Sequence, residues 1–295
     1  MIGLDREAVK KRFAEYTDNY NSSDPKIKLK IDHTYRVADL CERIAVTVPG
    51  APTALGKPTT PGAPGVSGTS TVPGAPGVSG TSTVPGTPTA DRDLAWLSGM
   101  LHDIGRFEQV RRYNTFSDAQ SVDHAAFGAD LLFKEGLLET FGDYDSDVRN
   151  ILETAIRNHN RFKVEEGLSD EYLTYCNILR DADKIDILRV NIDTPLEEIY
   201  NVSSEDLKNA GVTDAVKKGF MEERAILRSE RKTSADTLVS HISMIHELVY
   251  PISVEIVREQ GYLEKLLEFR SENEETNKWF DVMRNTLRDK GLIDR

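Results

Sequence analysis

Histidine and aspartate side chains are the residues of this chain whose types and order could bind metal. Four of the six histidines fall in separate helix-like segments of the N-terminal two-thirds, and one of them is followed directly by an aspartate. In chain order the set is His33, His102, Asp103, His124, His159 and Asp183. Imidazole nitrogens combined with carboxylate oxygens suit borderline divalent ions such as iron, manganese or zinc. Six ligands exceed the needs of one open catalytic ion and fit two ions that share a bridging carboxylate.

Each of these residues also has a plainer interpretation. A single histidine on an amphipathic helix is more often a packed or surface residue than a ligand, and we assign His241 and His246 in SHISMIHELV to that group. Asp103 could merely end a helix, and Asp183 could pair with Arg180. The conjunction of ligand types in helical context favours a metal site. In addition, Asp183 lies in a helix whose apolar residues should be buried, where a carboxylate needs a partner.

The segments that must position these side chains have helical hydrophobic patterns, and strand signals are nearly absent. The expected helices span residues 5–20, 27–46, 91–101, 122–135, 144–158, 171–190, 195–209, 213–228 and 234–259. Pro251 is expected to bend or divide the last of these, because proline lacks the amide hydrogen that a helix interior requires. The sequence therefore predicts an all-α fold.

Residues 48–90 differ from the rest of the chain. They hold nine of the 12 prolines and nine of the 20 glycines, and PGAPGVSGTSTV occurs there twice in tandem, at 61–72 and 73–84. Such a composition buries too little apolar surface to offset chain entropy, so we predict a disordered, Pro/Gly-rich insertion. Interrupted glycine triplets argue against a collagen helix. A tolerated loop insertion and a spacer or partner-binding tether both remain open.

Three segments resemble the HD-domain metal-dependent phosphohydrolase superfamily, whose defining pattern is H…HD…D. They are KIDHTYRV, LSGMLHDIGRF and NILRDADKIDIL, and HDIG is a frequent form of the central motif. The 69 residues from His33 to His102 are long for this family, but 26 remain when residues 48–90 are removed, which suits two consecutive helices. The resemblance covers about residues 27–190. It implies an HD-domain helical bundle at 1–190, with a C-terminal helical extension at 191–295 packed on it.

The resemblance also implies a ligand set for divalent ions. His33, His102, Asp103 and Asp183 would bind the first ion, with Asp103 as the bridge. In binuclear members two further histidines follow the HD pair, and His124 and His159 occupy that interval. We therefore expect two ions, although mononuclear members also exist. The ligand types do not distinguish between iron, manganese, zinc, cobalt, nickel and magnesium. Gly128, one turn after His124, would permit close helix approach.

The implied chemistry is hydrolysis of a phosphate ester or anhydride by metal-activated water, with a nucleotide or small phosphorylated metabolite as substrate. The expected catalytic residues are Asp103, Arg106 and Lys184, of which the two cations would hold the phosphate. Arg36 and Arg161 are further candidates. For each cation the alternative is a solvated or ion-paired side chain.

Two other functions are compatible with the same ligand set: a di-iron HD-type oxygenase and a non-catalytic metal-binding signalling module. Within the hydrolases, the motif reads HDIGRF rather than the HDxxED of (p)ppGpp hydrolases, and the Gly-Tyr-Pro segment of cyclic-dinucleotide enzymes is absent.

The composition limits the partners. With 37 basic and 49 acidic residues the net charge is −12, which gives no general attraction for nucleic acid or membrane. Two cysteines and no 18-residue apolar run favour a cytoplasmic protein. Arg228, Arg231 and Lys232 form either a phosphate trap at the pocket entrance or a solvated loop. The charged tail from Glu259 suggests a homo-oligomer surface or a lid.

Overall fold

The structure is a computed structural model that describes residues 3–21, 23–48 and 90–294. Within these ranges every regular element is a helix and no strand occurs, which confirms the all-α prediction. The α-helices are α1 (Arg6–Thr17), α2 (Pro25–Ala45), α3 (Arg92–Leu101), α4 (Ile104–Tyr113), α5 (His124–Phe133), α6 (Ser146–Asn158), α7 (Asp170–Asp193), α8 (Leu196–Tyr200), α9 (Ser204–Asn209), α10 (Asp214–Met221), α11 (Ser234–Ile242), α12 (Pro251–Gln260), α13 (Tyr262–Leu267) and α14 (Glu274–Asp289). Short 3₁₀ turns are η1 (Asp118–Gln120), η2 (Leu138–Thr140), η3 (Arg228–Glu230) and η4 (Ser243–Glu247).

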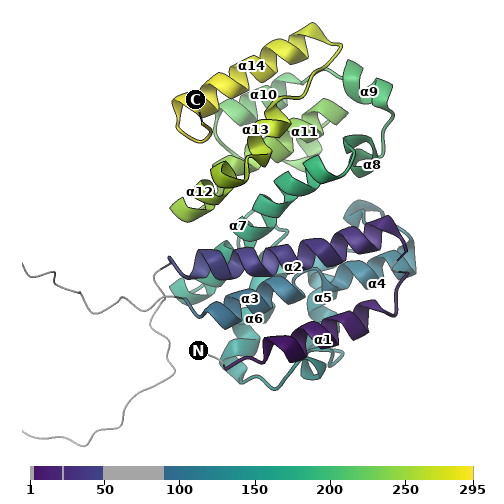
Figure 1. The fold of residues 1–295 in the computed structure, drawn as a ribbon, viewed down its shortest axis with the longest axis vertical. Helices are drawn as coiled ribbons and strands as arrows, with labels where there is room; N and C mark the ends of the chain where they lie inside the picture. Colours follow the sequence, from purple (N-terminus) through teal and green to yellow (C-terminus); the bar gives the residue numbers. More distant parts are fainter. Residues whose placement is uncertain (1–2, 22, 49–89, 295) are drawn as a thin grey trace, which may run out of the picture.

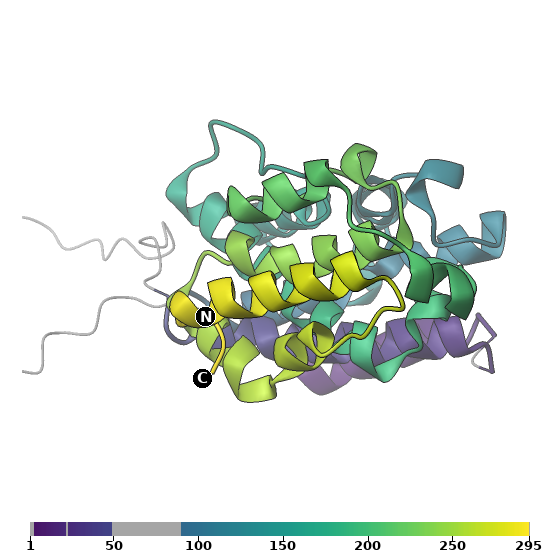
Figure 2. The ribbon, with the colours of Figure 1, turned by 90° about the horizontal axis from the view of Figure 1, so that it is seen from above.

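The helices form two groups that α7 connects. Figure 1 shows α1 to α6 in one half of the molecule and α8 to α14 in the other, with α7 running from the first group into the second. Seen from above in Figure 2, α14 lies across the top of the second group. The helix α7 passes through residue 190, where we placed the domain boundary, and that division remains a prediction.

Aspartate side chains begin most of the helices in the first group. The carboxylates of Asp5, Asp24, Asp91, Asp123 and Asp145 each accept a hydrogen bond from a backbone N–H in the first turn of α1, α2, α3, α5 and α6. Such caps satisfy amides that have no partner within the helix. Part of the large negative charge of the chain therefore serves to define where its helices begin.

The observed helix boundaries differ from the predicted ones in the C-terminal third. The segment 195–209 is split at Asn201, whose φ of 54° is left-handed and ends α8. The segment 213–228 ends as a helix at Met221. Pro251 divides the long segment as expected, because it stands at the first position of α12, where no intrahelical amide bond is needed.

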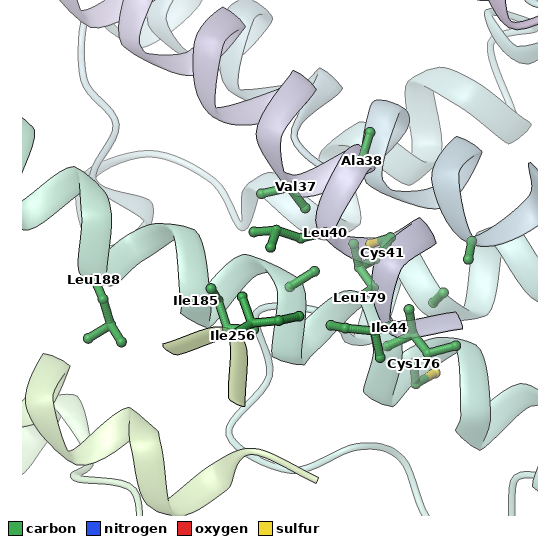
Figure 3. Packing of buried hydrophobic residues seen from close by; sticks show 14 of the residues in the cluster. Val37, Ala38, Leu40, Cys41, Ile44, Cys176, Leu179, Ile185, Leu188 and Ile256 are labelled. Atoms are coloured by element: carbon green, nitrogen blue, oxygen red, sulfur yellow. The ribbon is translucent and has the colours of Figure 1, made fainter. Parts of the chain in front are cut away.

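Figure 3 shows apolar side chains of α2 packed beside those of α7. Leu40, Cys41 and Ile44 of α2 face Cys176 and Leu179 of α7. Both cysteines are free and buried, and burial raises the pKa of Cys176 to about 12. They act as small apolar residues in the core, as their helical surroundings suggest.

The helices α2 and α3 form a tightly packed hairpin. The amide of Ala90 donates a hydrogen bond to the carbonyl of Val48 at 3.1 Å, and both residues are buried. A Cβ atom on Gly99 would lie 2.6 Å from the Cα of Ala38, so only glycine allows this approach of α3 to α2. Apart from its two end residues, the predicted disordered insertion at 48–90 lies outside the described residues.

No helix in the described ranges combines the length and the hydropathy needed to cross a membrane.

Candidate metal centre

The His102-Asp103 pair lies at the corner between α3 and α4. The helix α3 ends at Leu101, and Asp103 stands at the N-cap position of α4 with φ −101° and ψ 14°. Its carboxylate makes no capping hydrogen bond, unlike the aspartates that begin the neighbouring helices. Asp103 is nevertheless only 3% exposed. The side chain is therefore directed into the interior and does not serve to terminate a helix.

The first pair of histidines consists of His33, on α2, and His102, at the corner between α3 and α4. The Nε2 atoms of His33 and His102 lie 3.3 Å apart. Oδ1 of Asp183, from the middle of α7, lies 3.1 Å from Nε2 of His33 and 3.9 Å from Nε2 of His102. Oδ2 of Asp103 lies 3.7 Å and 3.6 Å from the same two nitrogens. Two imidazoles and two carboxylates thus converge on one point.

The second pair lies on the other side of Asp103. The Nε2 atoms of His124, at the start of α5, and His159, at the end of α6, are 3.0 Å apart. Oδ1 of Asp103 lies 3.4 Å from the first and 3.8 Å from the second. Each oxygen of this carboxylate therefore faces a different pair of histidines. All six expected ligands are brought together.

The other ring nitrogen of each histidine is held by an oxygen atom that can only accept. The Nδ1 partners are Oδ2 of Asp186 for His33, the carbonyl of Gly99 for His102, Oδ2 of Asp118 for His124 and the carbonyl of Ile156 for His159, at 2.6 to 2.7 Å. Nδ1 must carry the proton in these bonds, so Nε2 is the atom left to bind a ligand in the neutral ring. Metal-ligating histidines are usually oriented in this way.

The protonation states of His124 and His159 are those expected of two imidazoles that bind a metal ion between them. Burial, followed by Arg106, lowers the pKa of His124 to about 4, and burial, followed by His102, lowers the pKa of His159 to about 4. Both rings are thus neutral near pH 7, and their Nε2 lone pairs face each other at 3.0 Å. Two lone pairs at that distance repel, whereas a divalent ion bound by both would be stabilised.

His33 differs because it lies between two acids. Burial and Lys30 lower its pKa, but hydrogen bonds with Asp183 and Asp186 outweigh them, and the net shift is upward. A metal ion shared by His33 and Asp183 would replace the proton that this ring holds, as expected when metal binding is linked to proton release. Burial would raise the pKa of Asp183, but its histidine neighbours hold it well below the ordinary value.

Two glycines let the ligand-bearing helices approach. A Cβ atom on Gly105, in the HDIG motif, would lie 2.5 Å from the carbonyl oxygen of His124 and 2.6 Å from the amide nitrogen of Gly128. The helices α4 and α5 therefore touch through their backbones, which brings Asp103 beside His124. The expected close approach at Gly128 is confirmed.

Among the expected phosphate-binding cations, Arg106 lies at the centre. Its Nη1 atom donates to Oδ1 of Asp118 at 2.8 Å and to the carbonyl of Phe116 at 2.6 Å. Its Nε atom lies 3.6 Å from Oδ1 of Asp103 and is buried without a hydrogen-bond partner among the described residues. This guanidinium both fixes the partner of His124 and retains one buried donor.

The structure places the other expected cations in ion pairs with acids outside the set of six ligands. The ammonium of Lys184 lies 3.3 Å from Oε2 of Glu247, away from the histidines, because consecutive residues of a helix point about 100° apart. Arg36 binds Asp186, and Arg161 lies on the surface near Glu165. Lys184 is therefore not brought to the centre with its neighbour Asp183.

Three residues that contact the ligands were not predicted from the sequence. The ammonium of Lys30 lies 2.7 Å from Oδ2 of Asp103, and Asp186 and Asp118 hold His33 and His124. Lys30 precedes His33 by one helical turn, and Asp186 follows Asp183 by one turn, so a search one turn from each ligand would find both. Asp118 lies in a connection without periodicity and gives no such signal.

Arg180 supports the end of α6 and does not pair with Asp183. Its Nη1 atom donates to the carbonyls of Asn158 at 2.9 Å and His159 at 3.3 Å. The side chain is 7% exposed. It therefore fixes the backbone that presents His159, and the alternative in which Asp183 is merely its ion-pair partner is not what the structure shows.

Two overlapping groups of buried residues could hold metal ions, namely His33, His102 and Asp103, and Asp103, His124 and His159, and the ligand atoms of each group lie within 4.8 Å of one another. Comparison with protein families identifies an HD domain over residues 31–188, more than half of the chain and inclusive of every expected ligand. The chain belongs to the HD-domain family, whose members are mostly metal-dependent hydrolases. Comparisons with curated proteins and with solved structures gave no match.

Proposed function

We propose that this protein is a metal-dependent phosphohydrolase that uses two divalent ions to cleave a phosphate ester or anhydride. The substrate would be a nucleotide or a small phosphorylated metabolite. The observation that carries the proposal is the position of Asp103, whose two oxygens face two separate histidine pairs. A carboxylate so placed can bridge two ions.

The residues divide into two ligand sets. His33, His102 and Asp183 would hold one ion, His124 and His159 the other, and Asp103 both. When bound, the ions would supply a water molecule of lowered pKa and offset charge on the phosphoryl oxygens. The donor set contains no thiolate, which suits iron, manganese or zinc rather than soft metals.

Two cations of the chain would help to bind the phosphate. Arg106 has a buried Nε donor beside Asp103, and the side chain of Lys30, whose ammonium contacts the same carboxylate, is about one-fifth exposed. Fixed positive groups next to the reacting phosphate stabilise the charge that develops there. Lys184 is left out of this mechanism because its ammonium lies against Glu247.

The test is metal content by elemental analysis, on protein purified without chelator and supplied with manganese or iron. We expect about two ions per chain in the parent protein and about one in His124→Ala. The control His246→Ala removes a histidine that packs against Phe220 and should leave the metal content unchanged. A screen of phosphorylated metabolites for released phosphate then tests the activity.

Three outcomes would contradict the proposal. One ion in both the parent and His124→Ala would remove His124 from the centre. No bound ion under any of these conditions would favour a non-catalytic signalling module whose metal site is vestigial. Substrate turnover that requires oxygen and redox-active iron, without phosphate release, would assign the centre to an oxygenase.

A further inference from the structure

The chain contains 49 acidic residues, yet two arginines between α10 and α11 form no ion pair with any acid in the part of the chain that the structure describes. Within the same ranges, the side-chain hydrogen bonds of Arg228 are limited to Oγ of Ser117 at 3.4 Å, and those of Arg231 to Oγ of Ser240 at 3.2 Å. The Nε atom of Arg231 is buried and has no hydrogen-bond partner within these ranges. Arg228 is exposed and Arg231 is partly buried, and a buried N–H donor without a partner is unfavourable unless an acceptor such as an anion binds it.

The acids nearest in sequence are engaged elsewhere. Glu230, between the two arginines, binds Arg224 at 2.7 Å and accepts the amide of Leu227 at 2.8 Å. Asp236 accepts the amide of Lys232 at 2.8 Å and so fixes the entry into α11. The loop is therefore held in place by its own acids, while its two arginines remain available.

Ser240, which Arg231 contacts, is followed in the chain by His241, and Tyr200 lies 3.1 Å from Nδ1 of that ring. Tyr200 donates to Oδ1 of Asn191 at 2.7 Å, and Nδ1 of His241 lies 2.9 Å from the same oxygen. Burial, followed by Arg231, lowers the pKa of His241 to about 3, so this ring is neutral. Arg228 and Arg231 stand three residues apart at the 3₁₀ turn η3, where the amide of Arg231 donates to the carbonyl of Arg228 at 3.3 Å. Residues three apart in such a turn lie on the same side of it. Burial, followed by Arg228, also lowers the pKa of Arg231.

Both arginines are connected to elements that carry the metal centre. Arg228 contacts Ser117, the residue before Asp118, which holds His124. Asn191, beside His241, lies on α7 eight residues after Asp183, or about 12 Å along the helix axis at 1.5 Å per residue. A substrate bound at the metal centre could therefore extend toward the arginines.

We propose that Arg228 and Arg231 form a second phosphate-binding site, which binds a phosphate group of the substrate remote from the bond that is cleaved. Two guanidinium groups match a phosphate dianion in charge and in hydrogen-bond geometry better than they match a carboxylate. The link to the substrate rests on the proposed hydrolase function, whereas phosphate binding by the arginines does not. The class of substrate is thereby narrowed to molecules with two separated phosphate groups.

The experiment is calorimetric titration of inorganic phosphate into the full-length chain, with and without manganese. In chelator-treated protein we expect one phosphate to bind per chain, and Arg228→Gln and Arg231→Gln each to weaken its affinity about tenfold, since each removes charge-assisted hydrogen bonds. Arg270→Gln is the matched control: Arg270 is exposed and contacts only the carbonyl of Phe269 in the described ranges, so its loss should have no effect.

Unchanged phosphate affinity in both variants would overturn the second site, as would acetate binding with equal affinity. Circular dichroism checks that the variants fold. If Arg231→Gln does not fold, the phosphate affinity of Arg228→Gln alone tests the proposal, because Arg228 is exposed and its replacement should not disturb the fold. Failure of the protein to bind either manganese or iron would contradict the hydrolase proposal and leave the phosphate titration of chelator-treated protein interpretable.

Discussion

The ammonium of Lys30 lies 2.7 Å from Oδ2 of Asp103, the carboxylate oxygen that faces His33 and His102. Burial would raise the pKa of Asp103, but Lys30 and the neighbouring histidines hold it well below the ordinary value. Lys30 thus keeps a buried carboxylate ionised when no metal is bound. The same oxygen cannot serve the ammonium and a metal ion equally well.

Replacing Lys30 by Met should therefore raise the affinity for the first metal ion about tenfold, because a positive charge beside the ligand is removed. The control is Lys28→Met on the same helix, since Lys28 pairs on the surface with Asp32 at 2.6 Å. Competition with a chelating dye measures both affinities. Equal or weaker metal binding in Lys30→Met would show that the ammonium and the ion do not compete.

Asp186→Asn and Asp118→Asn should each lower the affinity for one of the two ions about 10- to 100-fold. This is the range found when the hydrogen-bond partner of a metal-bound histidine is replaced. An amide can donate to Nδ1, which moves the ring proton to Nε2 and removes the lone pair that binds metal. Titration of each variant with metal should show weaker binding of the first ion in Asp186→Asn, because Asp186 holds His33. It should show weaker binding of the second ion in Asp118→Asn, because Asp118 holds His124. The control is Asp143→Asn at an exposed position. Loss of both ions in either variant would contradict separate sites.

Gly128→Ala should destabilise the fold by about 1–3 kcal/mol, as overpacking usually does. The added Cβ would lie 2.9 Å from the amide nitrogen of Gly105, so α4 and α5 must separate. Metal content should fall as well, because these helices carry Asp103 and His124. Urea unfolding compares this variant with Gly211→Ala, where the new methyl would lie 3.6 Å from Nδ2 of Asn273, an ordinary contact distance. That control should be neutral or gain up to about 1 kcal/mol, and equal effects would refute the prediction.

Stability should fall in acid partly through His241. Its pKa is about 3 in the folded protein against an ordinary 6.5, so the unfolded chain binds a proton in this interval and the folded chain does not. The free energy of unfolding therefore decreases as the pH falls below 6.5, by up to about 1.4 kcal/mol per pH unit. Urea unfolding at about pH 7 and pH 5 measures how much free energy of unfolding is lost between these two values. In His241→Asn this loss should be smaller than in the parent protein by about 1–2 kcal/mol. Parallel pH curves for the two proteins would show that His241 does not contribute.

The ligand set could be predicted because it depends on residue type and order. Four histidines and two aspartates in separate helical segments indicate convergence once the chain is expected to fold as a helical bundle, and the structure brings all six together. The chemistry of proline also predicted that Pro251 would bend or divide the segment 234–259, and the structure begins α12 at this residue.

The side-chain directions could not be predicted from order alone. Lys184 follows Asp183 in sequence but turns toward Glu247, whereas Asp186, three residues on, returns to the face that holds His33. The helix α4 was not predicted. Only His102 and Asp103 separate its first residue, Ile104, from the end of α3 at Leu101. Asp118 depends on a non-helical connection, whose geometry is set by tertiary contacts with Arg106.

The hydrogen bond between Ala90 and Val48 bears on how this family member can vary in length. The bond joins the ends of residues 49–89, so the corner between α2 and α3 is closed by the helices themselves. The entropy of closing a connection grows only with the logarithm of its length, and gain or loss of one 12-residue copy changes folding by roughly 0.3 kcal/mol. Copy number at this position can therefore change by tandem duplication or deletion with little effect on the stability of the helical core.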